Sequence, residues 1–226
     1  MGSGHGRIAA ILGGPPVTWV MTGDSITQAH NTTDGRRGYA ELFAEHLRGH
    51  MRMERVRDAV VNTGVSGSTV AQALPEFHWR ISRFSPDVVS IAFGMNDCAD
   101  GPDAVGHFAF HLHQLVSRSL DTGAAVILHT PYPVGPGDDG DHGALPAYAE
   151  AIRKLGDDQR VPVVDHFTCW SAQPQRTTWY LDPWHANARG HVEMARLFVR
   201  TFDAGGDVGW LDDLAATLDR RTAASS

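Results

Sequence analysis

The sequence predicts an α/β protein in which a parallel sheet is covered by helices on both faces, a three-layer α/β/α sandwich. Strand-like and helix-like segments alternate along the 226 residues. The first strand-like run, 17–22 (VTWVMT), is mostly apolar and stops at Gly23, which is typical of a buried parallel strand that ends at a sheet edge. Right-handed crossovers between successive strands place helices on both faces.

Short apolar segments bounded by glycine, proline or polar residues predict the strands of this sheet. These segments are 17–23, 59–62, 87–93, 124–129 and 161–164. Pro162 interrupts the last segment. Because proline cannot donate a hydrogen bond to a neighbouring strand, we expect this segment at the edge of the sheet.

Helices are predicted between these strands, where apolar residues recur at helical spacing. In 105–120 one apolar face contains Phe108, Leu112 and Leu115. The other predicted helices are 39–47, 70–84 with a break near Pro75, 145–155, 187–202 and 208–218. The stretch 131–143 is rich in proline, glycine and aspartate and is predicted to be a long loop.

The length fits a single α/β domain, 1–226, because such domains often exceed the usual size. The first sixteen residues and about 220–226 are expected to be loosely held. A hydrophobic content of 42% and a charged content of 20% are ordinary for a soluble globular protein. The formal net charge of -7 argues against a nucleic-acid partner and suits a small neutral substrate.

Hydrophobic runs are too short for a membrane span, which needs roughly 18 apolar residues. The run 8–12 is also too short for a signal-peptide core, so a cytoplasmic location is predicted, although a removed leader would leave no trace. Cys98 and Cys169 are expected to be free thiols in a reducing compartment.

His107 and His111 have the i, i+4 spacing of two zinc ligands on a helix. Neither a third ligand nor a neighbouring glutamate accompanies them, so a solvated helix edge is favoured. The sequence therefore predicts neither a metal nor a cofactor.

Glycine and small polar residues follow three of the predicted strands. They are Gly23-Asp24-Ser25, 62–67 (NTGVSG) and 94–97 (GMND). Because the carboxyl ends of parallel strands meet at one edge, these stretches are expected to line one crevice. Ser25 lies there at a strand-to-helix turn, where an ordinary turn with an N-cap is an equally good interpretation of the local sequence.

A further polar stretch, Asp182-Pro183-Trp184-His185, precedes the last long predicted helix. A carboxylate three residues before a histidine on a tight turn can accept the Nδ1 proton of the imidazole. Nε2 is then left to face a serine.

Together these stretches resemble the SGNH hydrolases, a branch of the GDSL esterase and lipase family. Ser25 in GDSIT, Gly67 in NTGVSGST, the GMND stretch and Asp182 to His185 match four blocks of the family in order, over nearly the whole chain. One such motif alone is a weak signal, whereas four in order are a strong one. The resemblance implies a flavodoxin-like five-stranded sheet in the order 2-1-3-4-5 and hydrolysis of ester or thioester bonds without a metal.

The resemblance also implies a role for each matching residue. Ser25 would be the nucleophile, His185 its general base, and Asp182 the group that fixes the imidazole tautomer. The oxyanion would be bound by the backbone N–H groups of Ser25 and Gly67 and by the side-chain amide of Asn96.

Four neighbours of these residues are given other roles. Asp24 and Asp97 are expected to tie loops together, since a second carboxylate near the oxyanion would oppose catalysis. Cys98 is expected to be a buried small side chain. Trp184 either lines the acyl pocket or packs against the turn.

Substrate size is predicted from what the chain lacks: an inserted lid domain and an exposed apolar stretch suited to lipid. A small acyl group such as acetyl, on a sugar or another small molecule, is therefore the predicted substrate. A lysophospholipase or thioesterase is the alternative, and an acyltransferase using the same serine is also open. A non-catalytic binding module is less well supported, because it would not need the whole set of Ser25, His185, Asp182 and Asn96. Oligomeric state is not predicted.

Overall fold

The computed structural model describes residues 4–30, 32–51, 53–138, 140, 142–202 and 207–225. Its sheet has the strand order β2-β1-β3-β4-β5, and every pairing is parallel. The strands are β1 (Thr18–Gly23), β2 (Ala59–Asn62), β3 (Val88–Ala92), β4 (Ala125–His129) and β5 (Val163–Val164). The predicted strands and their order are confirmed, with β5, the segment that follows Pro162, at an edge.

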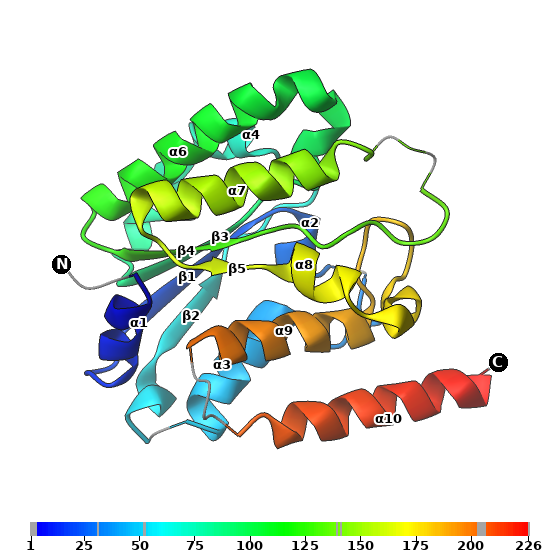
Figure 1. Cartoon of the computed structure of the whole chain (residues 1–226). Helices are drawn as coiled ribbons and strands as arrows, with labels where there is room; N and C mark the ends of the chain where they lie inside the picture. Colours follow the sequence, from blue (N-terminus) through cyan, green and yellow to red (C-terminus); the bar gives the residue numbers. More distant parts are fainter. Residues whose placement is uncertain are drawn as a thin grey trace.

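Helices cover both faces of the sheet, as predicted (Figure 1). One face carries α4 (Val70–Ala73), α6 (Val105–Asp121) and α7 (Leu145–Gln159), and the other carries α3 (Tyr39–Gly49) and α9 (Ala188–Phe202). The predicted break near Pro75 separates α4 from α5 (Phe77–Arg80). The helices that face the sheet supply the apolar residues that bury its strands.

Several short elements complete the chain. Helix α2 (Ser25–Gln28) follows β1, and α8 (His166–Ser171) follows β5. Short 3₁₀ helices span Met53–Arg57, Ser82–Phe84, Asp97–Asp100, Pro102–Ala104 and Pro174–Trp179. Hydrophobic periodicity does not reveal elements of this length, because they contain fewer than two helical turns.

Helix α1 (Gly4–Leu12) differs from the expectation that the first sixteen residues are loosely held. Ile8 is fully buried in the core, and the Arg7 guanidinium donates to the carbonyl of Gly123 at 2.5 Å. This segment is thus held by Ile8, by the partly buried Ile11 and Leu12, and by long-range hydrogen bonds, one of them from Arg55 to the carbonyl of Ile11. At the other end, α10 (Gly209–Ser225) runs through most of 220–226, and residue 226 lies outside the described residues.

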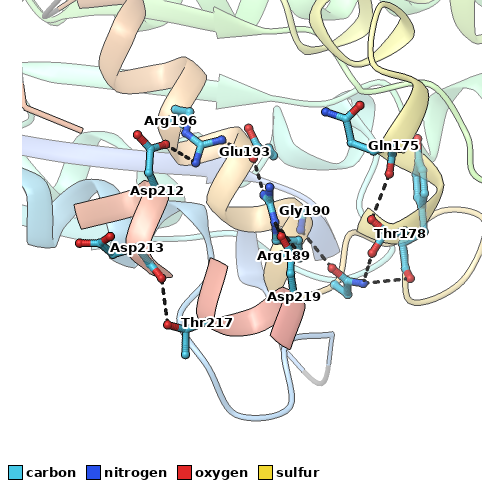
Figure 2. Close-up of polar contacts among 12 residues, drawn as sticks. Gln175, Thr178, Arg189, Gly190, Glu193, Arg196, Asp212, Asp213, Thr217 and Asp219 are labelled. Atoms are coloured by element: carbon cyan, nitrogen blue, oxygen red, sulfur yellow. Dashed lines mark hydrogen bonds and ion pairs between the residues drawn. The ribbon is translucent and has the colours of Figure 1, made fainter. Parts of the chain in front are cut away.

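Helix α10 lies on the outer side of α9, and ion pairs join the two helices (Figures 1 and 2). Arg189 contacts Asp219 at 3.1 Å and Arg196 contacts Asp212 at 2.6 Å, while Glu193 pairs with both arginines. The two α10 carboxylates are more than half exposed, and exposed ion pairs stabilise a fold by little. Burial of apolar residues of α10 therefore holds this helix in place.

A buried ion pair lies beside the start of β1. Asp58 accepts hydrogen bonds from the backbone N–H of Val17 (3.1 Å), from Trp19 Nε1 (2.9 Å) and from Arg55 Nη1 (3.2 Å). Both charged side chains are fully buried. Arg55 also donates to backbone carbonyls in 11–15, so the pair joins β1 to the segment that follows α1.

We expect Asp58→Ala to lower the free energy of unfolding by about 3 to 5 kcal/mol, because Arg55 would stay buried without its counter-charge. Urea denaturation followed by circular dichroism measures this change. Asp103→Ala is the control, since this aspartate is exposed and should change stability by no more than about 0.5 kcal/mol. Equal stability of the two variants would contradict a stabilising role for the pair.

Candidate active site

The end of β1 and the turn before α9 bring a serine, a histidine and an aspartate into one chain of hydrogen bonds. Ser25 Oγ lies 3.0 Å from His185 Nε2. On the other side of the ring, His185 Nδ1 lies 2.8 Å from Asp182 Oδ2. These distances suit a nucleophile, a base and a group that orients the base.

The local sequence around Ser25 explains its position. Ser25 is the first residue of α2, and Asp24 caps this helix by accepting the Ile26 N–H at 2.9 Å. A Cβ at Gly23 would lie 2.5 Å from the carbonyl oxygen of Ala92, so only glycine fits where β1 ends beside β3. This stretch is therefore both an N-capped turn and the segment that places Ser25 beside His185.

The turn that carries His185 is held by side chains from two segments. Asp182 Oδ1 accepts the N–H groups of Trp184 (2.9 Å) and His185 (2.8 Å). From the loop after β4, Tyr132 donates its hydroxyl to the carbonyl of Trp184 and accepts the N–H of Ala186. Burial raises the pKa of Asp182, but the hydrogen bonds from the imidazole and the two N–H groups outweigh it and hold the pKa below its ordinary value. Asp182 is thus a carboxylate at neutral pH.

Gly67 and Asn96 lie on the loops that follow β2 and β3. Gly67 has a φ of +76°, and a Cβ there would meet no atom within 4 Å, so the residue borders open space. Asn96 Nδ2 donates to the carbonyl of Ser68 (3.2 Å) and to Asp24 Oδ2 (3.3 Å). Asn96 is therefore tied both to the Gly67 loop and to the residue before Ser25.

Asp24 and Asp97 tie loops together, as predicted. Asp97 accepts the N–H groups of Val70 (2.9 Å) and Gly94 (3.0 Å), which joins the start of α4 to the end of β3. Burial raises the pKa of Asp97 to about 6. Burial, with Asp97 nearby, raises the pKa of Asp24 to about 7 despite its hydrogen bonds.

Arg80, on α5, joins the same loops without any indication in the sequence. This side chain is 2% exposed. Its Nη1 donates to the carbonyls of Gly23 (3.3 Å) and Thr63 (3.4 Å), and its Nη2 donates to Ser68 Oγ (2.9 Å). One guanidinium thus fixes the ends of β1 and β2 against the loop that carries Gly67.

The remaining candidates lie apart from this chain of hydrogen bonds. Cys98 is buried and donates to the carbonyl of Met95, and burial raises the pKa of its thiol to about 12, so it is the predicted inert small side chain. Cys169 is unpaired as well. His107 is exposed and His111 half-buried on α6. Across the described ranges, no three His, Cys, Asp or Glu side chains are grouped so that they could hold a metal ion.

An α/β/α sandwich with serine, histidine and aspartate in line at the carboxyl end of its sheet is an arrangement that serine hydrolases use. The chain matches the GDSL-like lipase/acylhydrolase family over residues 21–192. It therefore belongs to this family and is a carboxylic ester hydrolase. In the part of the chain that the structure describes, no helix has the length and apolar character needed to cross a membrane.

Individual relatives agree with this assignment. An acetylxylan esterase of Geobacillus stearothermophilus is 25% identical over 156 residues, which cover 62% of this chain and 70% of the relative. An alpha/beta hydrolase enzyme from the metagenome of Lake Arreo, Spain, is 25% identical with a TM-score of 0.71, covering 83% of this chain and 95% of its own. The lipase/acylhydrolase from Enterococcus faecalis, 23% identical with a TM-score of 0.70 over 84% of this chain and 97% of its own, shares the fold.

We expect a fluorophosphonate probe to label the protein once, at Ser25, because this hydroxyl has a histidine nitrogen within 3.0 Å. Mass spectrometry of the labelled protein locates the adduct. Ser25→Ala should remove the label, and Ser171→Ala, at an exposed serine, should keep it. A label that persists in Ser25→Ala, or fails to form on the folded wild type, would exclude Ser25 as the nucleophile.

Proposed function

We propose that this enzyme hydrolyses small acyl esters, acetyl esters above all, through an acyl-enzyme formed on Ser25. The hydrogen-bonded chain from Ser25 Oγ through His185 to Asp182, with links of 3.0 and 2.8 Å, is the observation that carries the proposal. The relative named as an acetylxylan esterase supports an acetyl group carried by a carbohydrate or another small molecule. A cytoplasmic location and the lack of a nucleic-acid partner stay predictions from the sequence.

In the first half of the reaction, Ser25 Oγ attacks the ester carbonyl carbon while His185 Nε2 takes the hydroxyl proton. Asp182 accepts a hydrogen bond from Nδ1–H, which keeps Nε2 unprotonated before the reaction and stabilises the imidazolium that forms. His185 then gives its proton to the alcohol oxygen, and the alcohol leaves. In the second half, His185 takes a proton from water, whose oxygen attacks the carbonyl carbon of the acyl-enzyme. His185 then returns this proton to Ser25 Oγ as the bond to the acyl group breaks and the acid leaves.

We assign stabilisation of the negative charge on the tetrahedral oxyanion to the N–H groups of Ser25 and Gly67 and to the Asn96 amide. The hydrogen bonds that Asn96 Nδ2 makes to Ser68 and Asp24 are long, at 3.2 and 3.3 Å, and they orient the amide before substrate binds. Because the pKa of Asp24 is raised to about 7, this carboxyl group is protonated, and so neutral, in a fraction of the molecules at neutral pH. Electrostatic repulsion between Asp24 and the oxyanion is reduced in proportion to that fraction.

We expect kcat/KM to be highest for acetyl or butyryl in a series of p-nitrophenyl esters from acetyl to palmitoyl. Asn96 bonds the residue before Ser25 and the backbone of Ser68, and these small or polar residues near the nucleophile suit a small acyl group. Acetylated sugars and an acyl-thioester complete the panel. A preference for long chains or for the thioester would favour a lysophospholipase or a thioesterase instead.

We expect Asn96→Ala to lower kcat on the order of 10²- to 10³-fold with little change in KM, because the lost hydrogen bond is made chiefly to the transition state. Steady-state kinetics of the folded variant measures this. Gly67→Ala is the contrast, since it keeps the backbone donor. With a φ of +76° and no atom near the new Cβ, its main effect should be a loss of about 1 to 2 kcal/mol in stability. If folded Asn96→Ala kept the wild-type kcat, Asn96 would not be an oxyanion donor and the GMND stretch would have a structural role only.

A further inference from the structure

Trp184 is a large aromatic side chain exposed directly beside the catalytic histidine. Its side chain is 37% exposed, although exposed large apolar residues are uncommon in this protein. It occupies the position before His185 in the turn that starts at Asp182. The sequence alone allows two roles for it, lining the acyl pocket or packing against the turn.

The indole ring is fixed by its neighbours. Trp184 Nε1 donates to Asp138 Oδ1 at 3.1 Å, and the imidazole of His142 lies 5.6 Å from the indole between ring centroids. His142 Nδ1 is in turn 3.2 Å from Asp138 Oδ1. The backbone N–H and carbonyl of Trp184 are bonded to Asp182 and Tyr132. With each of its polar groups in a hydrogen bond, Trp184 presents an apolar ring surface to solvent.

The role of His185 in the proposed mechanism indicates which half of the ester contacts the indole ring of Trp184. His185 Nε2 gives the proton to the leaving alcohol, so the alcohol half of the ester lies on the side of His185. Because Trp184 adjoins His185 in the same hydrogen-bonded turn, we assign its exposed ring to the side of the alcohol. This step rests on the proposed function.

We propose that Trp184, with Asp138 and His142 at its edge, forms a binding platform for a pyranose ring in the alcohol half of the substrate. A pyranose has a flat face of C–H groups that packs on an indole and hydroxyl groups around its rim that can bond a carboxylate and an imidazole. An alkyl chain in the same place would cover the exposed part of Asp138 and His142, whose side chains are 10% and 11% exposed, without bonding it. Because the indole is already held in place, little conformational entropy is lost when a sugar binds.

Binding without turnover tests the platform directly. In the Ser25→Ala protein, titration calorimetry with a mono-acetylated methyl pyranoside should show binding, and adding Trp184→Ala should raise Kd roughly 5- to 10-fold. Trp184→Phe should recover part of the affinity. Trp79→Ala is the matched control, because Trp79 is 49% exposed on α5 and should leave Kd unchanged. Equal effects of Trp184→Ala and Trp79→Ala, or no binding by Ser25→Ala, would overturn the proposal.

Turnover then separates the platform from a merely structural role. Trp184→Ala should lower kcat/KM for the acetylated pyranoside, relative to ethyl acetate, roughly 5- to 10-fold and mainly through KM. An equal loss on ethyl acetate, which has no ring, would mean that Trp184 only supports the turn. A larger loss of kcat/KM on phenyl acetate than on the pyranoside would indicate that the platform binds an aromatic alcohol and not a sugar. If wild type turns over none of these esters, the proposed function fails, while the calorimetry still decides the platform.

Discussion

The hydrogen bond between Ser25 and His185 joins residues 160 positions apart, and the strand order of the sheet makes it possible. β1 lies between β2 and β3, so the residues that follow it emerge beside the loops of both neighbours. Helix α9 packs on one face of the sheet, and the turn before it carries His185 to the same edge. A shift of α9 against β1 would separate the two atoms, and the packing of α9 is therefore a condition for the chemistry.

The loops around Ser25 are organised by charged groups that cost stability. Asp24 and Asp97 have pKa values raised from 3.8 to about 7 and about 6, so between roughly pH 4 and 7 the folded state binds more protons than the unfolded state. Stability contributed by these two groups therefore falls as pH rises through that range. A buried Arg80 ties the same loops. Such groups persist where fixed positions for the reacting atoms outweigh the loss in stability.

Sequence patterns predicted what is locally encoded and missed what depends on distant contacts. Buried strands show as short apolar runs bounded by glycine, proline or polar residues, and Asp182 and His185 lie within one turn, so both could be read from neighbouring residues. Arg80 and Tyr132 act on backbone groups 57 and 54 positions away, and nothing in their own neighbourhood marks that role. The same reason applies to α1, which is held by Ile8 in the core and by the long-range hydrogen bonds of Arg7 and Arg55.

Reaction type and substrate choice are encoded in different parts of this chain. Ser25, Gly67, Asn96 and His185 lie at strand ends or in a tight turn, where backbone geometry tolerates little change, and in the proposed mechanism they act at the carbonyl carbon. The loop between β4 and α7 lies outside the sheet, and its Tyr132 is bonded to the turn that carries His185. It supplies Asp138 and His142 beside Trp184. In the proposed mechanism, variation at Asp138 or His142 can therefore alter which alcohol is accepted, while Tyr132 keeps the turn that carries His185 in place.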